Sequence, residues 1–555
     1  MKTSNSAKLA ALIAAAALAL TACGTPTDTT TPSESPVASD TTSATPTEEP
    51  TTGGSYILGT TDTPIGLDPA VSYDMASWNL QYTGFQQLLR FPPNADAPVG
   101  DAAESCVMDD PKTVTCILRA GLKFANGHDL TSSDVKYSFE RNLLINEPEG
   151  ASILLASIAD DSGGENQKLT EGAIETPDDT TVIFHLNRAD TTFIALLSSA
   201  ATSIVDEESF PADAILDDAG VVAAQGSSGP LVLSSFTKGQ QAVFERNPNY
   251  TGDRPSVPDQ VFVQYFQDPT PMRQALESEQ IDIAWRTLSP TDLADLATKD
   301  NVVVHNGKGA EYRYWVFNEN SGIGKEKAVR QAVANIIDRD SITTNVYNGI
   351  KAPAYSQVPD GMPGYKASFA DKWGTTPNVD NAKAILEAAG VETPVELTIG
   401  YPPEHYGAEA ADEAAELSRQ LTDTGLFTTE LKSSEWTEYQ NLYREGAYDL
   451  FLLGWYPDIL DADNYLSPFL PNGGFMQNGY NNEEANKLIE DELAETDLAK
   501  RNEILGQIQD IIAEDVPIIP SWNGQNTAVA LPSVNGVLET LDANYIFRLW
   551  TVSKS

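Results

Sequence analysis

Residues 448–465 read YDLFLLGWYPDILDADNY and join an apolar strand pattern to an acidic, aromatic loop. The apolar run 451–453 has the length of a strand, and Gly454 and Pro457 end it. Ligands of α/β sheets bind at loops that leave the carboxyl ends of strands. A solvated acidic turn after a core strand would have the same composition. The loop is therefore one candidate site, with two rings and three carboxylates: Trp455, Tyr456, Asp458, Asp461 and Asp463.

The segments around this stretch alternate between strand and helix patterns. They run strand, helix, strand, helix, strand over 395–401, 410–421, 426–432, 436–444 and 448–455. This βαβαβ order predicts a parallel sheet with right-handed crossovers, and hence an α/β fold. Two helices, 483–493 and 498–513, are expected next, with Asp497 as the N-cap of the second, and 516–520 reads as a return strand.

Composition limits the possible partners. The chain of 555 residues is long enough for two or three domains with cores of their own. It has 80 acidic against 34 basic residues and a formal net charge of -46. We therefore expect no nucleic-acid partner, because like charges repel. The charge is spread along the whole chain, which is typical of a highly soluble exported protein.

The N-terminus predicts export. Lys2 and Lys8 precede an Ala/Leu run over 9–20 that is too short to span a bilayer but has the length of a signal-peptide core. The run ends in LTACG at 20–24, which resembles the bacterial lipobox, in which Cys23 is lipidated and becomes the first residue of the mature chain.

This N-terminal pattern divides the first 54 residues into two parts. Residues 1–22 are expected to be a lipoprotein signal peptide. Residues 23–54 are rich in Thr, Pro and Ser and have too few large apolar side chains to fold, so we expect a disordered tether. The mature protein would then be exported and held at the outer face of the cell membrane by its lipid anchor only.

The two remaining cysteines, Cys106 and Cys116, flank a β-rich hairpin pattern. A register centred on Pro111 places them directly opposite each other, which predicts a disulfide. Export into an oxidising space permits this bond. A metal or redox role would need a CxxC spacing or nearby histidines, and the hairpin has neither.

The block 118–141 reads LRAGLKFANGHDLTSSDVKYSFER. Thr131 and Asp134 form a capping-box pattern, and Val135, Phe139 and Leu143 repeat as the buried stripe of the helix that follows. The block closely resembles the signature of the extracellular solute-binding proteins of the peptide/nickel class, family 5. These proteins deliver ligands to ABC importers.

The resemblance continues in order along the chain, at 65–69 (IGLDP), 229–233 (GPLVL), 245–250 (ERNPNY), 280–284 (QIDIA) and 329–339 (VRQAVANIIDR). It implies an α/β, two-lobed fold like that of the periplasmic binding proteins, with a ligand cleft between the lobes. Lobe I is expected at 55–309 plus 516–555, with an inserted subdomain at roughly 92–200, and lobe II at 310–515.

The resemblance also implies a ligand site in the stretch 448–465. In peptide-binding members a Gly-Trp-x-x-Asp segment lies in the cleft, and its Asp receives the ligand's α-ammonium. Residues 454–458 match this segment, so Asp458 is the expected ammonium partner and Trp455 a wall of the pocket. Tyr456, Asp461 and Asp463 are further candidates, although 461–464 is equally consistent with a turn cap.

We therefore expect a monomeric binding lipoprotein that captures oligopeptides or dipeptides and hands them to permease and ATPase subunits. No enzyme activity, cofactor or metal is expected. Members of the family also bind nickel chelates, haem, oligosaccharides or opines, and the matching blocks do not separate these ligands. A secreted lipoprotein hydrolase is the alternative class, because the members of a Ser/His/Asp triad need not be neighbours in sequence. The chain lacks the GxSxG, P-loop and HExxH motifs.

Overall fold

The computed structural model describes residues 53–555, except 149, 161–167, 321, 404, 408 and 472–473. The predicted signal peptide, the lipidation site Cys23 and all but the last two residues of the predicted tether lie outside the described residues. Within the described ranges, no helix is long and apolar enough to cross a membrane.

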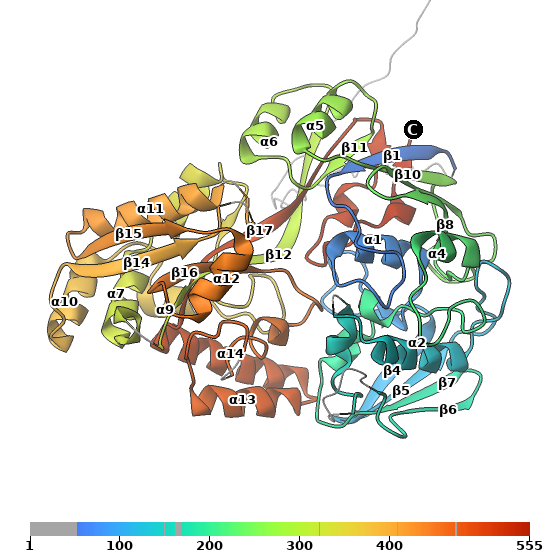
Figure 1. Cartoon of the computed structure of the whole chain (residues 1–555), viewed down its shortest axis with the longest axis horizontal. Helices are drawn as coiled ribbons and strands as arrows, with labels where there is room; N and C mark the ends of the chain where they lie inside the picture. The colour runs from blue at the N-terminus through green and yellow to red at the C-terminus, as the bar shows by residue number, and fades with distance from the viewer. Residues whose placement is uncertain are drawn as a thin grey trace, which may run out of the picture. The chain divides into compact units, whose positions relative to one another are not determined.

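One sheet of eleven strands runs through the described part of the chain (Figure 1). Ten strands follow one another in the order β15 (Phe427–Ser433), β14 (Val395–Tyr401), β16 (Leu450–Trp455), β12 (Val303–Phe317), β17 (Ile518–Ala530), β11 (Ile283–Trp285), β1 (Ser55–Thr60), β10 (Gln260–Tyr265), β9 (Gln241–Arg246) and β8 (Leu231–Thr237). The eleventh strand, β13 (Ala352–Pro353), pairs with β17.

The two long strands β12 and β17 join the halves of this sheet, in the middle of Figure 1. Their antiparallel register shifts between Lys308 and Tyr312. Gly309 and Gly524 lie at this shift, and a Cβ on Gly309 would come within 2.6 Å of the Gly524 carbonyl oxygen. A Cβ on Gly524 would come within 2.7 Å of the Glu311 side chain. Glycine is therefore needed on both strands where the sheet passes from one half to the other.

Two cores lie on the two sides of this crossing. One contains buried residues of the ranges 56–85 and 205–302 together with residues from Ala528 to Val552. The other contains buried residues from Ala310 to Trp522. The longer helices around the sheets are α1 (Met75–Gly84), α2 (Ser132–Ile145), α4 (Asp218–Ala224), α5 (Pro269–Glu277), α6 (Pro290–Leu296), α7 (Lys327–Ile336), α9 (Ser368–Trp373), α10 (Val379–Ala389), α11 (Glu409–Asp423), α12 (Trp436–Arg444), α13 (Glu483–Leu493) and α14 (Leu498–Asp515).

The βαβαβ prediction is confirmed, with one difference at its last strand. β14 is parallel to both β15 and β16, and α11 and α12 are the intervening helices. β16 also pairs antiparallel with β12, so this half of the sheet is mixed. The Asp497 side chain caps α14 as predicted, and the predicted return strand is β17, which extends to Ala530.

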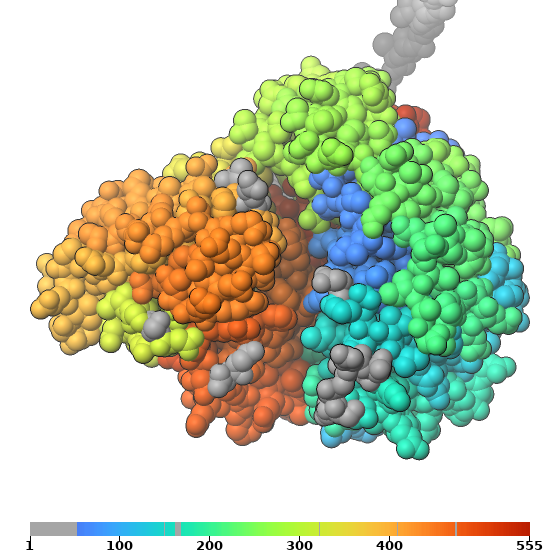
Figure 2. Space-filling view, viewed as in Figure 1, coloured from blue at the N-terminus to red at the C-terminus, as the bar shows by residue number. Residues whose placement is uncertain are grey.

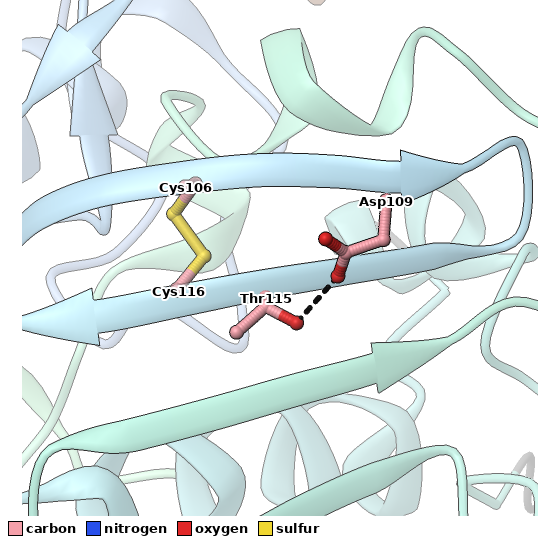
Figure 3. The surroundings of a disulfide bond; sticks show 4 residues. All are labelled: Cys106, Asp109, Thr115 and Cys116. Atoms are coloured by element: carbon pink, nitrogen blue, oxygen red, sulfur yellow. Dashed lines mark hydrogen bonds between the residues drawn. A yellow bond between two sulfur atoms is a disulfide. The ribbon is translucent and has the colours of Figure 1, made fainter.

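A smaller four-stranded sheet has the order β4 (Ala103–Asp110), β5 (Thr113–Leu118), β7 (Thr181–His185) and β6 (Ile174–Asp178). Cys106 and Cys116 are directly opposed on β4 and β5 and form the predicted disulfide (Figure 3). Beyond the bond, Thr115 donates a 2.7 Å hydrogen bond from its hydroxyl to Asp109. The predicted capping box at Thr131 starts α2.

Two sequence blocks that are far apart in the chain meet beside α2. The Asp68 carboxylate accepts hydrogen bonds from Arg141 Nη1 at 2.7 Å and from Arg141 Nη2 at 2.6 Å. Asp68 is fully buried, and Arg141 is 2% exposed. Such bidentate pairing satisfies both buried charges. The Leu-Asp-Pro block and the end of the Tyr-Ser-Phe-Glu-Arg block therefore form one interaction.

Candidate ligand-binding site

A cavity of about 210 Å³, here called the first cavity, lies where the loop after β16 meets α1 and the C-terminal segment. Figure 2 shows the molecule hollowed between the orange part of the chain and the blue and cyan parts, and the orange and blue parts supply much of this lining. The lining of this cavity includes the side chains of Tyr73, Arg286, Tyr456, Asp458 and Tyr545.

Asp458 is held in the wall of the first cavity by neutral hydrogen-bond donors. Tyr73, just before α1, donates its hydroxyl to Oδ1 at 2.7 Å, and the Asn464 side-chain amide donates to Oδ2 at 3.3 Å. Asn464 also fixes the loop, because its Oδ1 accepts from the Asp458 backbone N–H at 2.9 Å and from Trp455 Nε1 at 3.0 Å. Within the described part of the chain, Asp458 has no ion pair with a basic side chain.

The electrostatics of Asp458 follow from this setting. Burial raises the pKa of the carboxyl to about 6, although the hydrogen bonds from Tyr73 and Asn464 oppose the shift. Burial, together with the nearby Asp458 charge, also raises the pKa of the Tyr73 hydroxyl. A desolvated carboxylate without a cation is the electrostatic counterpart of a positively charged ligand group.

A second cavity of about 500 Å³ shares Arg286, Tyr456 and Tyr545 with the first. Its wall includes Glu311 on β12, which accepts from Arg313 Nη2 at 2.9 Å. Lys351 Nζ donates to the other carboxylate oxygen of Glu311 at 2.8 Å.

These two basic side chains decide the charge of Glu311. Burial opposes ionisation of Glu311, but Lys351 and Arg313 outweigh burial and lower its pKa to about 2. Glu311 is therefore a carboxylate at neutral pH, and the second cavity is lined by paired charges on one side.

Tyr456 and Asp458 line the first cavity, whereas Trp455, Asp461 and Asp463 are absent from the linings of both cavities. The Trp455 ring packs edge-on against Phe469, with centroids 4.9 Å apart, and so supports the loop from behind.

Asp461 and Asp463 face the helices α13 and α14. Arg501 donates to both oxygens of Asp461, at 2.8 and 2.7 Å, and the Asp461 side chain caps the short helix Ala462–Tyr465. Asp463 is buried and accepts from Ser467 at 2.7 Å. Burial and, next, the Asp463 charge raise the pKa of Glu492 to about 10. These contacts agree with the turn-cap interpretation of 461–464.

Sequence reasoning missed Tyr73, Arg286, Glu311, Arg313 and Lys351. They come from the segment before α1, the end of β11, β12 and the segment before β13. No motif joins these segments, so no local signal marked them. The one available signal was the scarcity of basic residues in a strongly acidic chain, which makes each buried cation informative.

Solved structures resemble the whole described fold. The DppA protein from Helicobacter pylori in complex with the peptide STSA has a TM-score of 0.69 at 19% identity, covering 91% of this chain and 98% of that chain. CtaP from Listeria monocytogenes has a TM-score of 0.77 at 23% identity, covering 91% of this chain and 99% of that chain. The predicted two-lobed α/β fold of the periplasmic binding proteins is confirmed.

Similar sequences differ in the ligands that their names record. DdpA of Escherichia coli (strain K12), a probable D,D-dipeptide-binding periplasmic protein, is 27% identical over 509 residues, 90% of this chain and 94% of that protein. Oligopeptide-binding protein OppA of Bacillus subtilis (strain 168) is 24% identical over 499 residues, 87% of this chain and 90% of that protein. Heme-binding protein A of Haemophilus influenzae is 26% identical over 508 residues, 88% of this chain and 90% of that protein.

The model of the bacterial extracellular solute-binding proteins, family 5 Middle, matches residues 97–477, more than half of the chain. Members of this family are periplasmic or extracellular binding proteins and not enzymes, which removes the hydrolase alternative. The resemblance noted in the sequence is thus confirmed, and the chain belongs to the family 5 extracellular solute-binding proteins.

Proposed function

We propose that this protein captures short peptides outside the cell membrane and delivers them to the permease and ATPase subunits of an ABC importer. The observation that carries the proposal is Asp458, a partly buried carboxylate in the cavity wall whose partners are a hydroxyl and an amide. A transported peptide varies in its side chains, but its α-ammonium is constant. A carboxylate that binds the ammonium gives affinity that does not depend on the side chains of the peptide.

Among the alternatives that the family offers, haem fits this cavity wall less well. Haem carries two propionates, and these anions would be repelled by an ionised Asp458. Sugars are neutral and would leave the Asp458 charge desolvated without a partner. Peptide binding also agrees with the names of several relatives, among them DdpA and OppA.

Ligand identification tests the proposal directly. The protein would be purified under non-denaturing conditions, and native mass spectrometry would weigh the molecule that it retains. We expect a mixture of short peptides, and added dipeptide should raise the melting temperature in a concentration-dependent way. A retained sugar, haem or metal chelate, with no melting shift from any dipeptide, would refute the proposal.

We further propose that Cys23 carries the lipid anchor and that residues 23–54 form the tether. The lipobox-like sequence and the absence of large apolar side chains after it support this. In a cell expressing the full chain, the wild-type protein should sediment with membranes, and a Cys23→Ser variant should be released by a salt wash. A Cys23→Ser variant that stays on membranes would contradict the anchor.

We also propose that the chain crosses from one lobe to the other at Gly309 and again at Gly524. The two lobes would close on the ligand as rigid bodies, as hinged binding proteins do. The register shift at these glycines and the two separate cores support this division. Small-angle scattering should show a smaller radius of gyration when dipeptide is added. An unchanged radius at saturation would contradict closure.

A further inference from the structure

Asp461 and Asp463 follow Asp458 in the loop after β16 but lie outside the linings of both cavities. They connect this loop to the end of α13 instead. Arg501 of α14 donates to both oxygens of Asp461, and its Nε donates to Glu492 at 2.8 Å. Glu492 is fully buried in the last turn of α13. Charge-assisted hydrogen bonds therefore hold the ligand-binding loop and the end of α13 in one arrangement.

Asp463 makes a second connection to Glu492. Burial and, next, the Asp463 charge keep Glu492 protonated at neutral pH, since they raise its pKa to about 10. The Glu492 carboxyl is hydrogen-bonded to Asp463, so the two buried groups share one proton. The last turn of α13 is thus fixed to the ligand-binding loop by two contacts of Glu492.

The end of α13 also contacts the part of the chain that carries the four-stranded sheet (Figure 1). The Thr191 backbone N–H donates to the Leu493 carbonyl at 3.0 Å, and the Thr191 hydroxyl donates to the Glu492 carbonyl at 3.4 Å. Phe193, two residues after Thr191, is in the core of the four-stranded sheet. Leu493 packs against the core on the other side of the β12–β17 crossing. The hydrogen bond therefore joins two separately packed parts of the protein.

Buried polar groups hold Thr191 in place. Asp190, which is 7% exposed, accepts from the Thr192 backbone N–H at 3.1 Å and from the Ser157 hydroxyl. The Asp190 backbone N–H donates to the Pro111 carbonyl at 3.0 Å. Both sides of the contact with α13 are thus fixed within their own part of the protein. A rigid-body movement of the two parts would break the hydrogen bond from Thr191 without disturbing either core.

This contact is separate from the ligand cavities. Thr191, Glu492 and Leu493 are absent from the linings of the first and the second cavity. Ile459, by contrast, lines the first cavity and packs against the core of the four-stranded sheet. The contact at Thr191 can therefore stabilise the closed arrangement without touching the ligand.

We infer that the hydrogen bond from Thr191 to Leu493 is a clasp that holds the two lobes closed, and that Arg501 couples this clasp to the ligand-binding loop. The inference rests on the proposed closure of the lobes and names a contact that stabilises it. Arg501 is a positioning residue, because it acts through Asp461 and Glu492. Since the ligand and the clasp both favour the closed state, each strengthens the other.

Hydrogen exchange of two backbone amides, resolved to single residues by mass spectrometry, tests the clasp in the wild-type protein. The Thr191 N–H should exchange rapidly without ligand, because open lobes remove its acceptor, and saturating Ala-Ala should slow this exchange at least about 10-fold. The control is the His185 N–H, which donates to the Ala173 carbonyl at 2.8 Å and should exchange equally with and without Ala-Ala. A Thr191 N–H as well protected as that of His185 in the ligand-free protein would refute the clasp.

Variants of Thr191 measure the clasp by its effect on ligand release. Thr191→Pro lacks the N–H donor and should release Ala-Ala about 3- to 10-fold faster, as the loss of one net hydrogen bond predicts, with little change in the association rate. Thr191→Ala keeps the N–H and should release Ala-Ala at the wild-type rate. A wild-type release rate in Thr191→Pro would contradict the clasp.

Variants of Arg501 test the coupling. Arg501→Gln should speed the exchange of the Thr191 N–H in the Ala-Ala complex, and Arg501→Lys should do so less, because lysine keeps the charge but lacks the bidentate geometry. The matched control is Lys500→Gln, at a neighbouring side chain that is 65% exposed, and it should leave this exchange unchanged. Protection of the His185 N–H shows that each variant is folded. Unchanged exchange at Thr191 in Arg501→Gln would refute the coupling.

Failure of the clasp and failure of the proposed function give different results. If Ala-Ala makes the protein more compact in solution scattering but does not protect the Thr191 N–H, the lobes close without the clasp, and only the inference fails. If Ala-Ala does not bind, the peptide proposal fails. Exchange of the ligand-free protein then still decides the inference, since rapid exchange at Thr191 beside a protected His185 supports the clasp and equal protection refutes it.

Discussion

The buried pair between Asp68 and Arg141 gives a prediction about stability that the structure makes quantitative. Arg141 also donates from Nε to the Pro211 carbonyl at 2.7 Å and from Nη2 to the Ala214 carbonyl at 2.8 Å. Asp68 accepts the Leu216 backbone N–H at 2.8 Å. The pair therefore fastens the segment before α1 to α2 and to residues 211–216.

Asp68→Asn keeps the shape of the side chain but leaves Arg141 as a buried, uncompensated cation. Breaking one side of a buried pair costs about 3–5 kcal/mol. Urea denaturation, monitored by tryptophan fluorescence, should therefore show that the variant is less stable by about that amount. The destabilised transition should be the unfolding of the lobe that contains α2.

An exposed carboxylate serves as the matched control. Asp423 pairs with Arg419 at 2.8 Å on the surface of α11, and its side chain is 64% exposed. Asp423→Asn should change stability by at most about 0.5 kcal/mol. A loss for Asp68→Asn that is no larger than the loss for Asp423→Asn would show that burial does not make the Asp68–Arg141 pair more important for stability than an exposed pair.

Three further predictions concern pH, packing and the disulfide. Binding of a free dipeptide should weaken as the pH falls through about 6, because burial raises the pKa of Asp458 to about 6 and protonation removes the charge that binds the ammonium. Calorimetry at pH 5 and pH 8 measures this change in affinity, and the Asp458→Asn variant should not show it. Gly454→Ala should lower the free energy of unfolding, measured in urea, by about 1–3 kcal/mol, since the new Cβ would overlap the Arg313 guanidinium. The control Gly506→Ala in α14, where the nearest atom to the new Cβ is 3.5 Å away, should be neutral or stabilising. Replacing Cys106 and Cys116 by Ser should cost about 2 kcal/mol, at the low end for disulfides because the closed loop is short. The replacement should leave dipeptide affinity unchanged, since neither residue lines the first or the second cavity, and a large loss of affinity would contradict this.

Local patterns predicted the secondary structure well where they were long and periodic. The helix predicted at 436–444 is α12 over the same residues, and the helix predicted at 483–493 is α13. The capping residues Thr131 and Asp497 marked true helix starts, because a cap acts within a few residues of itself. The antiparallel pairing of β16 with β12 was missed, since it joins strands more than a hundred residues apart.

The candidate site was predicted less completely. Asp458 and Tyr456 were identified through the Gly-Trp-x-x-Asp segment, and both line the first cavity. In the sequence, Asp461 and Asp463 could not be distinguished from Asp458 as ligand-binding carboxylates. In the structure they face α13 and α14, and Arg501 of α14 pairs with Asp461. Arg286 was invisible for the same reason, because only the folded sheet brings the end of β11 to the loop after β16.

A double-mutant cycle measures the proposed interaction between Asp458 and the ammonium of a peptide. Calorimetry would compare the wild type and Asp458→Asn, each with Ala-Ala and with N-acetyl-Ala-Ala. Losing one partner of the buried pair should weaken binding by about two to four powers of ten, whether the change is in the protein or in the peptide. We expect that the two losses do not add, because both remove the same interaction. Additive losses, or full affinity of Asp458→Asn for Ala-Ala, would contradict it.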